Sequence, residues 1–150
     1  MLIFSFGCGC QDFLKIDSAN DTSPYAVGKR NIKITDKGLE ASVFYPLDKS
    51  DSLEYDALWL ENPELTLRNL KADFGRKFKL SWIPSNLLKS MTMVKIPATM
   101  NMAIAQRFAR NHDTIRPLVF SHGNSADKAF YTAVHHALAA HGYLVIAVNH

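Results

Sequence analysis

The sequence predicts an α/β fold, an open sheet containing a parallel strand-helix-strand unit, and three features of its last third carry this prediction. Residues 115–121 and 143–148 are apolar runs rich in β-branched and aliphatic side chains, which is typical of buried strands. Between them, apolar residues recur at the three- and four-residue spacing of one buried helical face: Phe130, Ala133, Val134, Ala137 and Leu138. A unit of this kind almost always has a right-handed crossover and belongs to an open α/β sheet.

The first third predicts an irregular segment followed by a β-hairpin. Residues 1–22 are expected to be irregular, and the polar run at 20–24 is a loop signature. Residues 31–35 and 39–45 are two β-type runs around a turn that has Gly38 where a positive φ is needed. Pro46 is expected to end the second strand. Alternation places one set of its residues on one side: Leu39, Ala41, Val43 and Tyr45.

The middle of the chain predicts short helices. Residues 47–55 are polar and acidic and indicate a loop. Residues 58–102 have a mostly helical pattern that three prolines interrupt, Pro63, Pro84 and Pro97, so several short helices are expected. Residues 103–111 could extend a helix. Because 150 residues is a common size for a single core, the chain predicts one domain and not two.

The helix of the last third has predictable ends. Asn124 or Ser125 is expected to cap its start, with Asp127 in the first turn, where the helix dipole favours an anion. Gly142 predicts its end, and His141 is expected to cap the last carbonyls. The uninterrupted apolar run at 143–148 predicts a parallel strand covered on both faces.

The sequence predicts no metal site and no cofactor. His135 and His136 are neighbours on the predicted helix, about 100° apart, so they cannot bind one metal ion together, and both are expected on its surface. Cys8 and Cys10 are too close in sequence for an unstrained disulfide and have no nearby histidines, so free thiols are expected. The turn after residue 121 has too few glycines for a dinucleotide-binding or Walker loop.

Charge and hydropathy exclude some partners. The chain has 17 basic and 14 acidic residues, too small an excess to indicate nucleic acid. Seven of the basic residues but one acidic residue fall within 66–95, so this stretch is a positive patch. No transmembrane helix is expected, because histidines and Gly142 interrupt the uncharged run at 129–150. The first ten residues resemble a short signal sequence but lack a preceding basic residue and a cleavage site.

The change of character at 121–124, from apolar residues to Ser-His-Gly-Asn, predicts a ligand site. In open α/β sheets, ligands bind beyond the carboxyl ends of the strands. Gly123 allows a sharp turn and close approach of a ligand, and the start of the following helix presents free N–H groups. Such donors stabilise the oxyanion of ester hydrolysis by roughly 3 to 4 kcal/mol each. The alternative is a strand-to-helix turn that binds no substrate.

The run PLVFSHGNSADKAFYTAVHHALAAHGYLVIAVNH resembles the corresponding part of the platelet-activating factor acetylhydrolase family, whose members are α/β-hydrolases. Three upstream pieces match in the same order: SPYAVGKRNI, ASVFYPLD and YDALWLENPE. The resemblance covers residues 23–150 and implies the N-terminal part of a single α/β-hydrolase domain. It also implies a serine-dependent phospholipid esterase that hydrolyses the short sn-2 acyl ester, such as acetyl, of platelet-activating factor-like lipids.

The resemblance implies roles only for residues that match. It assigns the backbone N–H of Asn124 to the oxyanion hole, and His122 and Gly123 to the loop that holds it, with His122 ordering the loop through hydrogen bonds. No G-x-S-x-G motif occurs, and Ser125 follows the wrong strand to be the nucleophile. The catalytic part is therefore expected to be absent, and this chain to be inactive. A structural role is expected for His150.

The basic segment predicts a lipid interface. Its charged residues alternate with large apolar ones, a composition suited to a membrane surface: Phe78, Trp82, Ile83, Leu87 and Leu88. The family is expected to use helices in this region to reach its substrate. Pro84 interrupts the apolar stripe, so packing against the core is slightly favoured over the lipid interface.

Two other functions stay open at this point: a general short-chain carboxylesterase of the same fold, and a non-catalytic truncated product that binds lipid. The expected partner is a phospholipid, with peripheral contact to a membrane or lipid particle. A cytoplasmic or membrane-peripheral location is expected, with secretion as the alternative. With only part of the larger sheet present in this chain, the strand at 143–148 is expected to keep an open edge and an uncovered face, which promotes aggregation.

Overall fold

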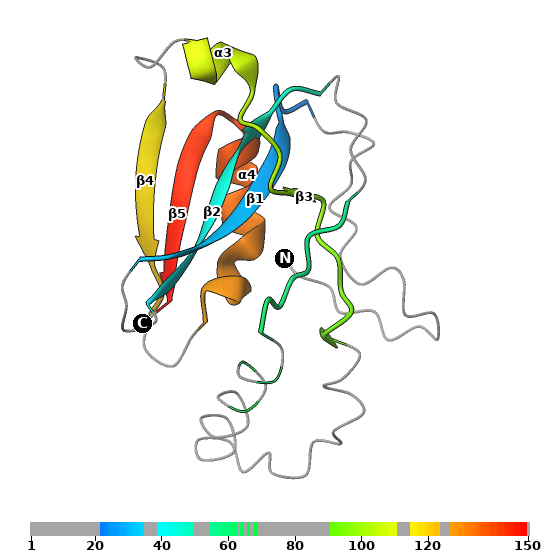
Figure 1. The fold of residues 1–150 in the computed structure, drawn as a ribbon, viewed down its shortest axis with the longest axis vertical. Coiled ribbons are helices and arrows are strands. Elements are labelled where there is room, and N and C mark those ends of the chain that lie inside the picture. Colours follow the sequence, from blue (N-terminus) through cyan, green and yellow to red (C-terminus); the bar gives the residue numbers. More distant parts are fainter. Residues whose placement is uncertain are drawn as a thin grey trace.

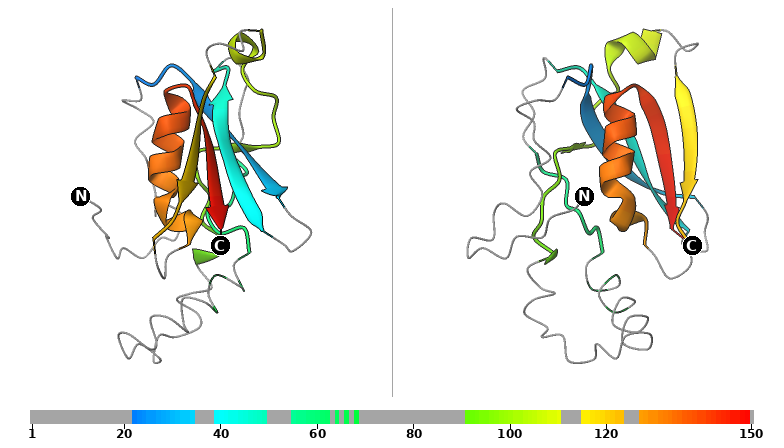
Figure 2. Two further views of the ribbon diagram at one scale, coloured as in Figure 1. Left: turned by 90° about the vertical axis from the view of Figure 1, so that its left-hand side faces the viewer. Right: turned by 180° about the vertical axis from the view of Figure 1, so that it is seen from behind.

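The computed structural model describes residues 22–34, 39–49, 55–62, 64, 66, 68, 91–110, 115–123 and 127–149. These residues form one five-stranded sheet in the order β3-β1-β2-β5-β4, with helix α4 across one face (Figures 1 and 2). The elements, in chain order, are β1 (Ala26–Lys33), β2 (Glu40–Leu47), β3 (Thr99–Met100), α3 (Gln106–Arg110), β4 (Arg116–Ser121), the 3-10 turn η3 (Lys128–Tyr131), α4 (Thr132–Ala140) and β5 (Tyr143–Asn149). The predictions for residues 1–21, including Cys8 and Cys10, lie outside the described residues.

The predicted strand-helix-strand unit is confirmed. β4 and β5 are parallel, in register from Arg116 opposite Tyr143 to Ser121 opposite Val148, and η3 and α4 connect them. Gly142 ends the helix with φ of 94°, the left-handed conformation that glycine adopts without strain. The Nδ1 atom of His141 lies 2.8 Å from the Ala137 carbonyl oxygen, so this side chain caps the helix as expected.

The predicted hairpin is also confirmed, although its strands are longer. β1 and β2 pair antiparallel from Ala26 opposite Leu47 to Lys33 opposite Glu40. The prediction that Pro46 ends the strand is wrong, because it lies inside β2. Pairing between β2 and β5 stops at Phe44, so the missing N–H of Pro46 removes no bond from that ladder, and its carbonyl accepts from the Ala105 N–H at 2.9 Å.

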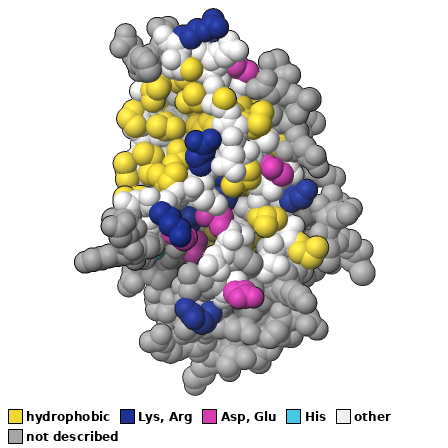
Figure 3. Space-filling view, in the orientation of Figure 1, with side chains coloured by type: hydrophobic (Ala, Val, Ile, Leu, Met, Phe, Trp, Pro, Cys, Tyr) yellow, Lys and Arg dark blue, Asp and Glu magenta, His cyan; other side chains and the backbone are white. Residues whose placement is uncertain are grey.

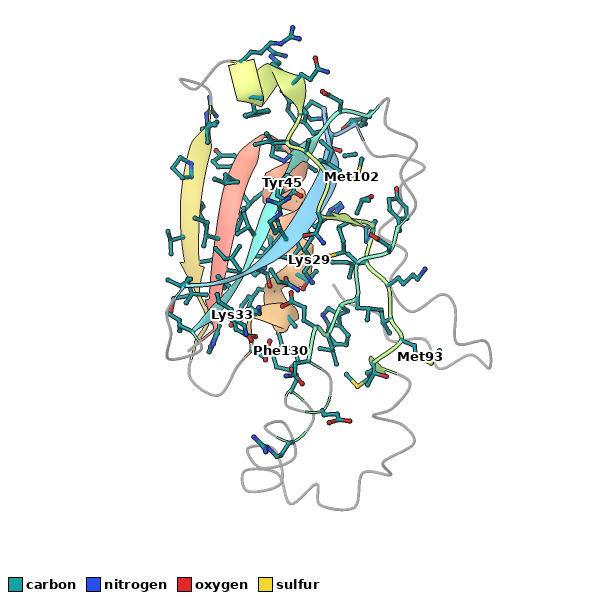
Figure 4. The ribbon with its side chains drawn as sticks, in the orientation of Figure 1. Lys29, Lys33, Tyr45, Met93, Met102 and Phe130 are labelled. Atoms are coloured by element: carbon teal, nitrogen blue, oxygen red, sulfur yellow. The ribbon has the colours of Figure 1, made fainter. Side chains whose placement is uncertain are left out.

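The alternation predicted for β2 identifies residues that share one face, but residues on the other face are buried as well. Ala41 and Tyr45 are buried, and so are Ser42 and Phe44 on the opposite face. The Tyr45 ring lies over Gly28, and its hydroxyl donates to the Met102 carbonyl at 2.7 Å (Figure 4). β2 is therefore covered on both faces along much of its length.

The predicted buried face of the last helix is wrong. Phe130 and Val134 are 39% and 48% exposed, whereas His135 is fully buried and His136 is 8% exposed. The residues of α4 that are buried against the sheet are Thr132, His135, His136, Ala139 and Ala140. Small alanines allow close approach, and two of the three polar members have hydrogen-bond partners: Thr132 donates to the Ala129 carbonyl, and His136 bonds the Pro97 carbonyl. The spacing of apolar residues in the sequence carries no information about these hydrogen-bond partners.

The predictions for β4 and β5 need correction as well. β4 was expected to be buried, but Val119 is 70% exposed, and β4 is the edge strand of the described sheet. β5 was expected to have an open edge, but it lies between β2 and β4. α4 covers the face of β5 that carries Val145 and Ala147, both fully buried, while the opposite face is partly open, and Figure 3 shows apolar side chains gathered there. A helix on one side of the sheet buries only one face of the strand. An apolar run in the sequence does not show whether one face or both faces are covered.

Parts of the middle segment, residues 58–102, are extended, although short helices were predicted there. Leu58 pairs with Lys95 in an isolated bridge, and Thr99 and Met100 form β3, parallel to β1. The bridge is reinforced by the Ile96 N–H donating to the Ala57 carbonyl at 2.9 Å. Ala57, Ile96 and Ala98 thus join the core that Val27, Phe44 and Val145 form with α4. The predicted helix at 103–111 is shorter, spanning Gln106–Arg110.

Candidate active site

The loop that follows β4 lies at the carboxyl end of the two parallel strands. Ser121 closes the β4 ladder opposite Val148, and His122 and Gly123 come directly after it. The arrowheads of β4 and β5 lie at the same end of the sheet as η3 (Figure 1). Of the three predicted loop residues, the structure describes His122 and Gly123, whereas Asn124 lies outside the described residues.

His122 is buried, and its ring contacts the loop to which it belongs. Its side chain is 8% exposed, and Nδ1 lies 3.0 Å from the Gly123 carbonyl oxygen, so this nitrogen donates when it carries the proton. The contact holds the ring against the Gly123 carbonyl. It is the kind of contact expected of a side chain that orders the loop.

The prediction that Gly123 is needed for a sharp turn is wrong. Its φ is not in the left-handed region, and a Cβ placed on it would meet its nearest neighbour, Oη of Tyr131, at 3.8 Å. An ordinary van der Waals contact at this distance is tolerated, so neither the backbone nor the packing requires glycine here. The turn that was predicted to need Gly123 therefore does not need a glycine.

The helix after the loop begins later than predicted. Asp127, rather than Asn124 or Ser125, is the N-cap, and its Oδ1 accepts from the Ala129 N–H at 2.9 Å. Its other oxygen accepts from Thr66 Oγ1 at 3.4 Å. Asp127 thus satisfies one of the free N–H groups at the start of η3, whereas Asn124 and Ser125 lie outside the described residues.

An ion cluster that sequence reasoning missed lies at the start of η3. Nζ of Lys29 and Nζ of Lys128 each lie 2.8 Å from one of the two carboxylate oxygens of Glu61. Ser42 Oγ donates a short hydrogen bond to the same carboxylate, and Lys29 also donates to the Leu58 carbonyl at 2.9 Å. Lys29, from the middle of β1, is 1% exposed (Figure 4). The one sequence signal is a lysine at an inward position of a strand, two residues after the buried Val27.

The cluster keeps its carboxylate ionised. Burial raises the pKa of Glu61, but the ammonium groups of Lys29 and Lys128 outweigh this effect and hold the pKa below its usual value. Burial lowers the pKa of Lys29, and the Glu61 carboxylate opposes that change without cancelling it. The charges therefore depend on one another, because each ammonium group is buried beside the same anion.

A small cavity adjoins the cluster and is bordered by His135. It has a volume of about 30 Å³, and its lining includes Lys29, Glu61, Thr132 and His135. The His135 ring packs against Phe44 and Phe120, with centroids at 5.3 and 4.6 Å, and neither ring nitrogen has a hydrogen-bond partner among the described residues. Burial, together with Lys29 and Lys128, lowers the pKa of His135 to about 4, so the imidazole is neutral at pH 7.

The remaining predictions concern metal binding, a membrane-spanning helix and the lipid interface. Among the described residues, no three His, Cys, Asp or Glu side chains come together in a way that could hold a metal ion. In the same part of the chain, no helix has both the length and the apolar character needed to cross a membrane. The predicted lipid-interface residues lie outside the described residues, as does His150: Phe78, Trp82, Ile83, Leu87 and Leu88.

Comparison with known proteins decides the family. The model of the family described as "Platelet-activating factor acetylhydrolase, isoform II" matches residues 12–150. The chain belongs to this family. It is 30% identical over 152 residues to a platelet-activating factor acetylhydrolase of Cavia porcellus, and 31% identical over 128 residues to one of Bos taurus. The family resemblance expected from the sequence is thus confirmed.

The chain spans about a third or less of these relatives. The match covers all of this chain but 31% of the Cavia porcellus protein, and 84% of this chain but 26% of the Bos taurus protein. Among solved structures, a ferulic acid esterase from Streptomyces cinnamoneus is similar, with a TM-score of 0.57 and 19% identity over 86% of this chain and 34% of that protein. This likeness supports the fold, an incomplete α/β-hydrolase sheet.

Proposed function

We propose that this chain forms the oxyanion-loop part of a serine-dependent esterase that removes the short sn-2 acyl group, such as acetyl, from phospholipids. The observation that carries the proposal is the position of His122 and Gly123, at the carboxyl end of β4 and before the capped turn at Asp127, in a member of the platelet-activating factor acetylhydrolase family. In an open α/β sheet, this is where ligands bind.

The proposed chemistry is acyl transfer to a serine. The serine Oγ attacks the ester carbonyl carbon, and the electron pair of the C=O bond moves onto the carbonyl oxygen. The backbone N–H of Asn124 donates to that oxygen. Collapse of the tetrahedral intermediate breaks the bond to the glycerol oxygen, which leaves with a proton as the lysophospholipid alcohol. Water then hydrolyses the acyl-serine, and no metal is needed at any step.

In this scheme, the residues of this chain bind and orient while the nucleophile comes from elsewhere. Since no G-x-S-x-G motif is present, we assign the nucleophile and its base to the part of the relatives that the match does not cover. His122 orders the loop through its bond to the Gly123 carbonyl, and Gly123 leaves room for the ester beside the donor. This chain by itself would therefore bind no serine-reactive probe.

The substrate class is tested with the complete polypeptide, meaning this chain continued to the length of its relatives. We expect faster hydrolysis, by kcat/KM, of a phospholipid with an sn-2 acetyl group than of p-nitrophenyl acetate. Equal or higher efficiency on the p-nitrophenyl ester would favour a general short-chain carboxylesterase. Lack of labelling of any serine by a fluorophosphonate would contradict the proposed enzyme class altogether.

Access to lipid-borne substrate is proposed for the apolar residues of the basic segment. Binding to phospholipid vesicles should be lost when Trp82→Asp and Leu87→Asp are combined, because two charges would replace the side chains that enter the interface. Sedimentation of the protein with vesicles measures this. Unchanged sedimentation of the double variant would mean that the segment packs against the protein instead.

A further inference from the structure

His135 is a buried polar side chain at the centre of the packing between α4 and the sheet. Neither of its ring nitrogens has a hydrogen-bond partner among the described residues. A buried polar group without a partner lowers stability, and an internal water molecule commonly supplies the missing hydrogen bond. His135 is 0% exposed, so bulk water does not serve it. Its partner must therefore lie inside the protein.

The ring of His135 needs a hydrogen-bond donor. At pH 7 the imidazole is neutral, so one nitrogen carries a proton and the other has a lone pair. The rings of Phe44 and Phe120 pack against it. Their π electrons can face an N–H group, but they have no polar hydrogen to give. The unprotonated nitrogen must receive its hydrogen from another group.

The hydroxyl groups that line the cavity beside His135 already donate elsewhere. Ser42 and Thr132 both belong to this lining. The Ser42 hydroxyl donates to the Glu61 carboxylate, and the Thr132 hydroxyl donates to the Ala129 carbonyl at 2.7 Å. Each hydroxyl has one hydrogen, so neither has another for the imidazole.

The two lysines that line the cavity have ammonium hydrogens left to donate. Within the described residues, Lys29 (Figure 4) donates to Glu61 and to the Leu58 carbonyl, and so uses two of its three hydrogens. Lys128 donates one of its three, to Glu61. Burial is the main cause of the low pKa of His135, and both ammonium groups lower it further. Both positive charges therefore lie near the ring, although neither bonds it directly.

A group that joins an ammonium to an imidazole nitrogen must accept one hydrogen bond and donate another. We infer that the cavity is a water-binding site, in which at least one water molecule accepts from Lys29 or Lys128 and donates to a ring nitrogen of His135. The cavity volume of about 30 Å³ is sufficient, since one water needs roughly 10 to 15 Å³ of such space. A halide ion has no hydrogen for the ring, and a metal ion has no lone pair for the ammonium, so neither replaces water. The site lies where α4 packs on the sheet, and its occupancy does not depend on the proposed esterase activity.

The test is a crystal structure of the complete wild-type polypeptide at a resolution that shows ordered water. We expect a water oxygen about 2.7 to 3.2 Å from a ring nitrogen of His135 and at a similar distance from Nζ of Lys29 or Lys128. Ring nitrogens without any water beside them, or a ring that bonds a protein group directly, would overturn the inference.

A crystal of the same protein soaked in sodium bromide separates water from an anion. We expect no anomalous bromine peak in the cavity, because a bromide ion cannot donate to the imidazole. A bromine peak beside His135 would show an anion site instead and would also overturn the inference.

A variant tests whether the ring holds the water. In the crystal structure of His135→Leu, the water should be lost, because leucine neither donates nor accepts a hydrogen bond. His141→Leu is the matched control, since His141 follows the same helix, is exposed and lies outside the cavity lining. It should keep the water. A water that stays in place in His135→Leu would contradict the bond to the ring.

Discussion

At the scale of single residues, Gly123 has no positive φ, and the nearest described atom to an added Cβ is Oη of Tyr131 at 3.8 Å. We expect Gly123→Ala to leave the free energy of unfolding unchanged or to raise it by up to about 1 kcal/mol, because alanine restricts the unfolded chain. The added methyl group would project toward the ester, so kcat/KM should fall tenfold or more. Denaturation curves and kinetics of the complete enzyme measure both effects. Full activity in the variant would remove the functional reason for this glycine.

His135 makes stability depend on pH. Its pKa is about 4 in the folded protein and about 6.5 in an unfolded chain, so the unfolded state takes up a proton first as the pH falls. The contribution of the neutral ring is therefore present above pH 6.5 and is lost toward pH 4. Between pH 7 and pH 5, the wild type should lose about 2 kcal/mol more stability than His135→Leu does.

Denaturant titrations of both proteins at the two pH values test this. Leucine is close to histidine in volume and leaves no polar atom unpaired, so the variant should also be at least as stable at pH 7. Equal pH dependence in both proteins would show that the ring does not titrate as its burial implies.

At the scale of elements, the end of α4 depends on Gly142. Its φ of 94° strains any other residue, and a Cβ there would lie 3.1 Å from Cζ of Phe108. We expect Gly142→Ala to lower the free energy of unfolding by about 1 to 3 kcal/mol while kcat per folded molecule stays unchanged. This is the reverse of the pattern expected for Gly123→Ala, so each variant serves as the control for the other. A neutral effect of Gly142→Ala would contradict the described helix end.

Elements whose signals are local could be predicted from the sequence, whereas their burial could not. The strand-helix-strand unit, the hairpin and the Gly142 stop follow from runs and turn residues next to each other in the chain. The buried face of α4 was assigned to the wrong side, because it is decided by the rings of Phe44 and Phe120 and the Pro97 carbonyl. None of these groups is near α4 in sequence.

The candidate site, too, could be predicted only in part from the sequence. The His-Gly loop could be found because a change of composition marks it, and because ligands in this fold class bind at strand ends. The Glu61 cluster could not be found, since its two lysines are 99 positions apart and ordinary lysines lie at the surface. The position of β1 in the sheet, the course of residues 57–62 and the packing of η3 bring them together.

At the scale of the whole molecule, the described sheet has an open edge. β4 pairs with β5 alone among the described strands, and Val119 on its uncovered face is 70% exposed. Unpaired edge groups beside apolar side chains favour association with a second chain. We expect the 150-residue chain, produced by itself, to self-associate in light scattering, and Val119→Lys to shift it toward monomers. A wild-type monomer that unfolds cooperatively would contradict this expectation.

The account depends most on where the backbone N–H of Asn124 points, and one measurement tests it directly. The complete polypeptide is inactivated with an organophosphonate, whose phosphonyl oxygen stands for the oxyanion, and the crystal structure of the adduct is determined. We predict a phosphonyl-serine whose oxygen lies about 2.7 to 3.2 Å from the backbone nitrogen of residue 124. An oxygen directed away from that nitrogen, or the absence of any labelled serine, would contradict the account.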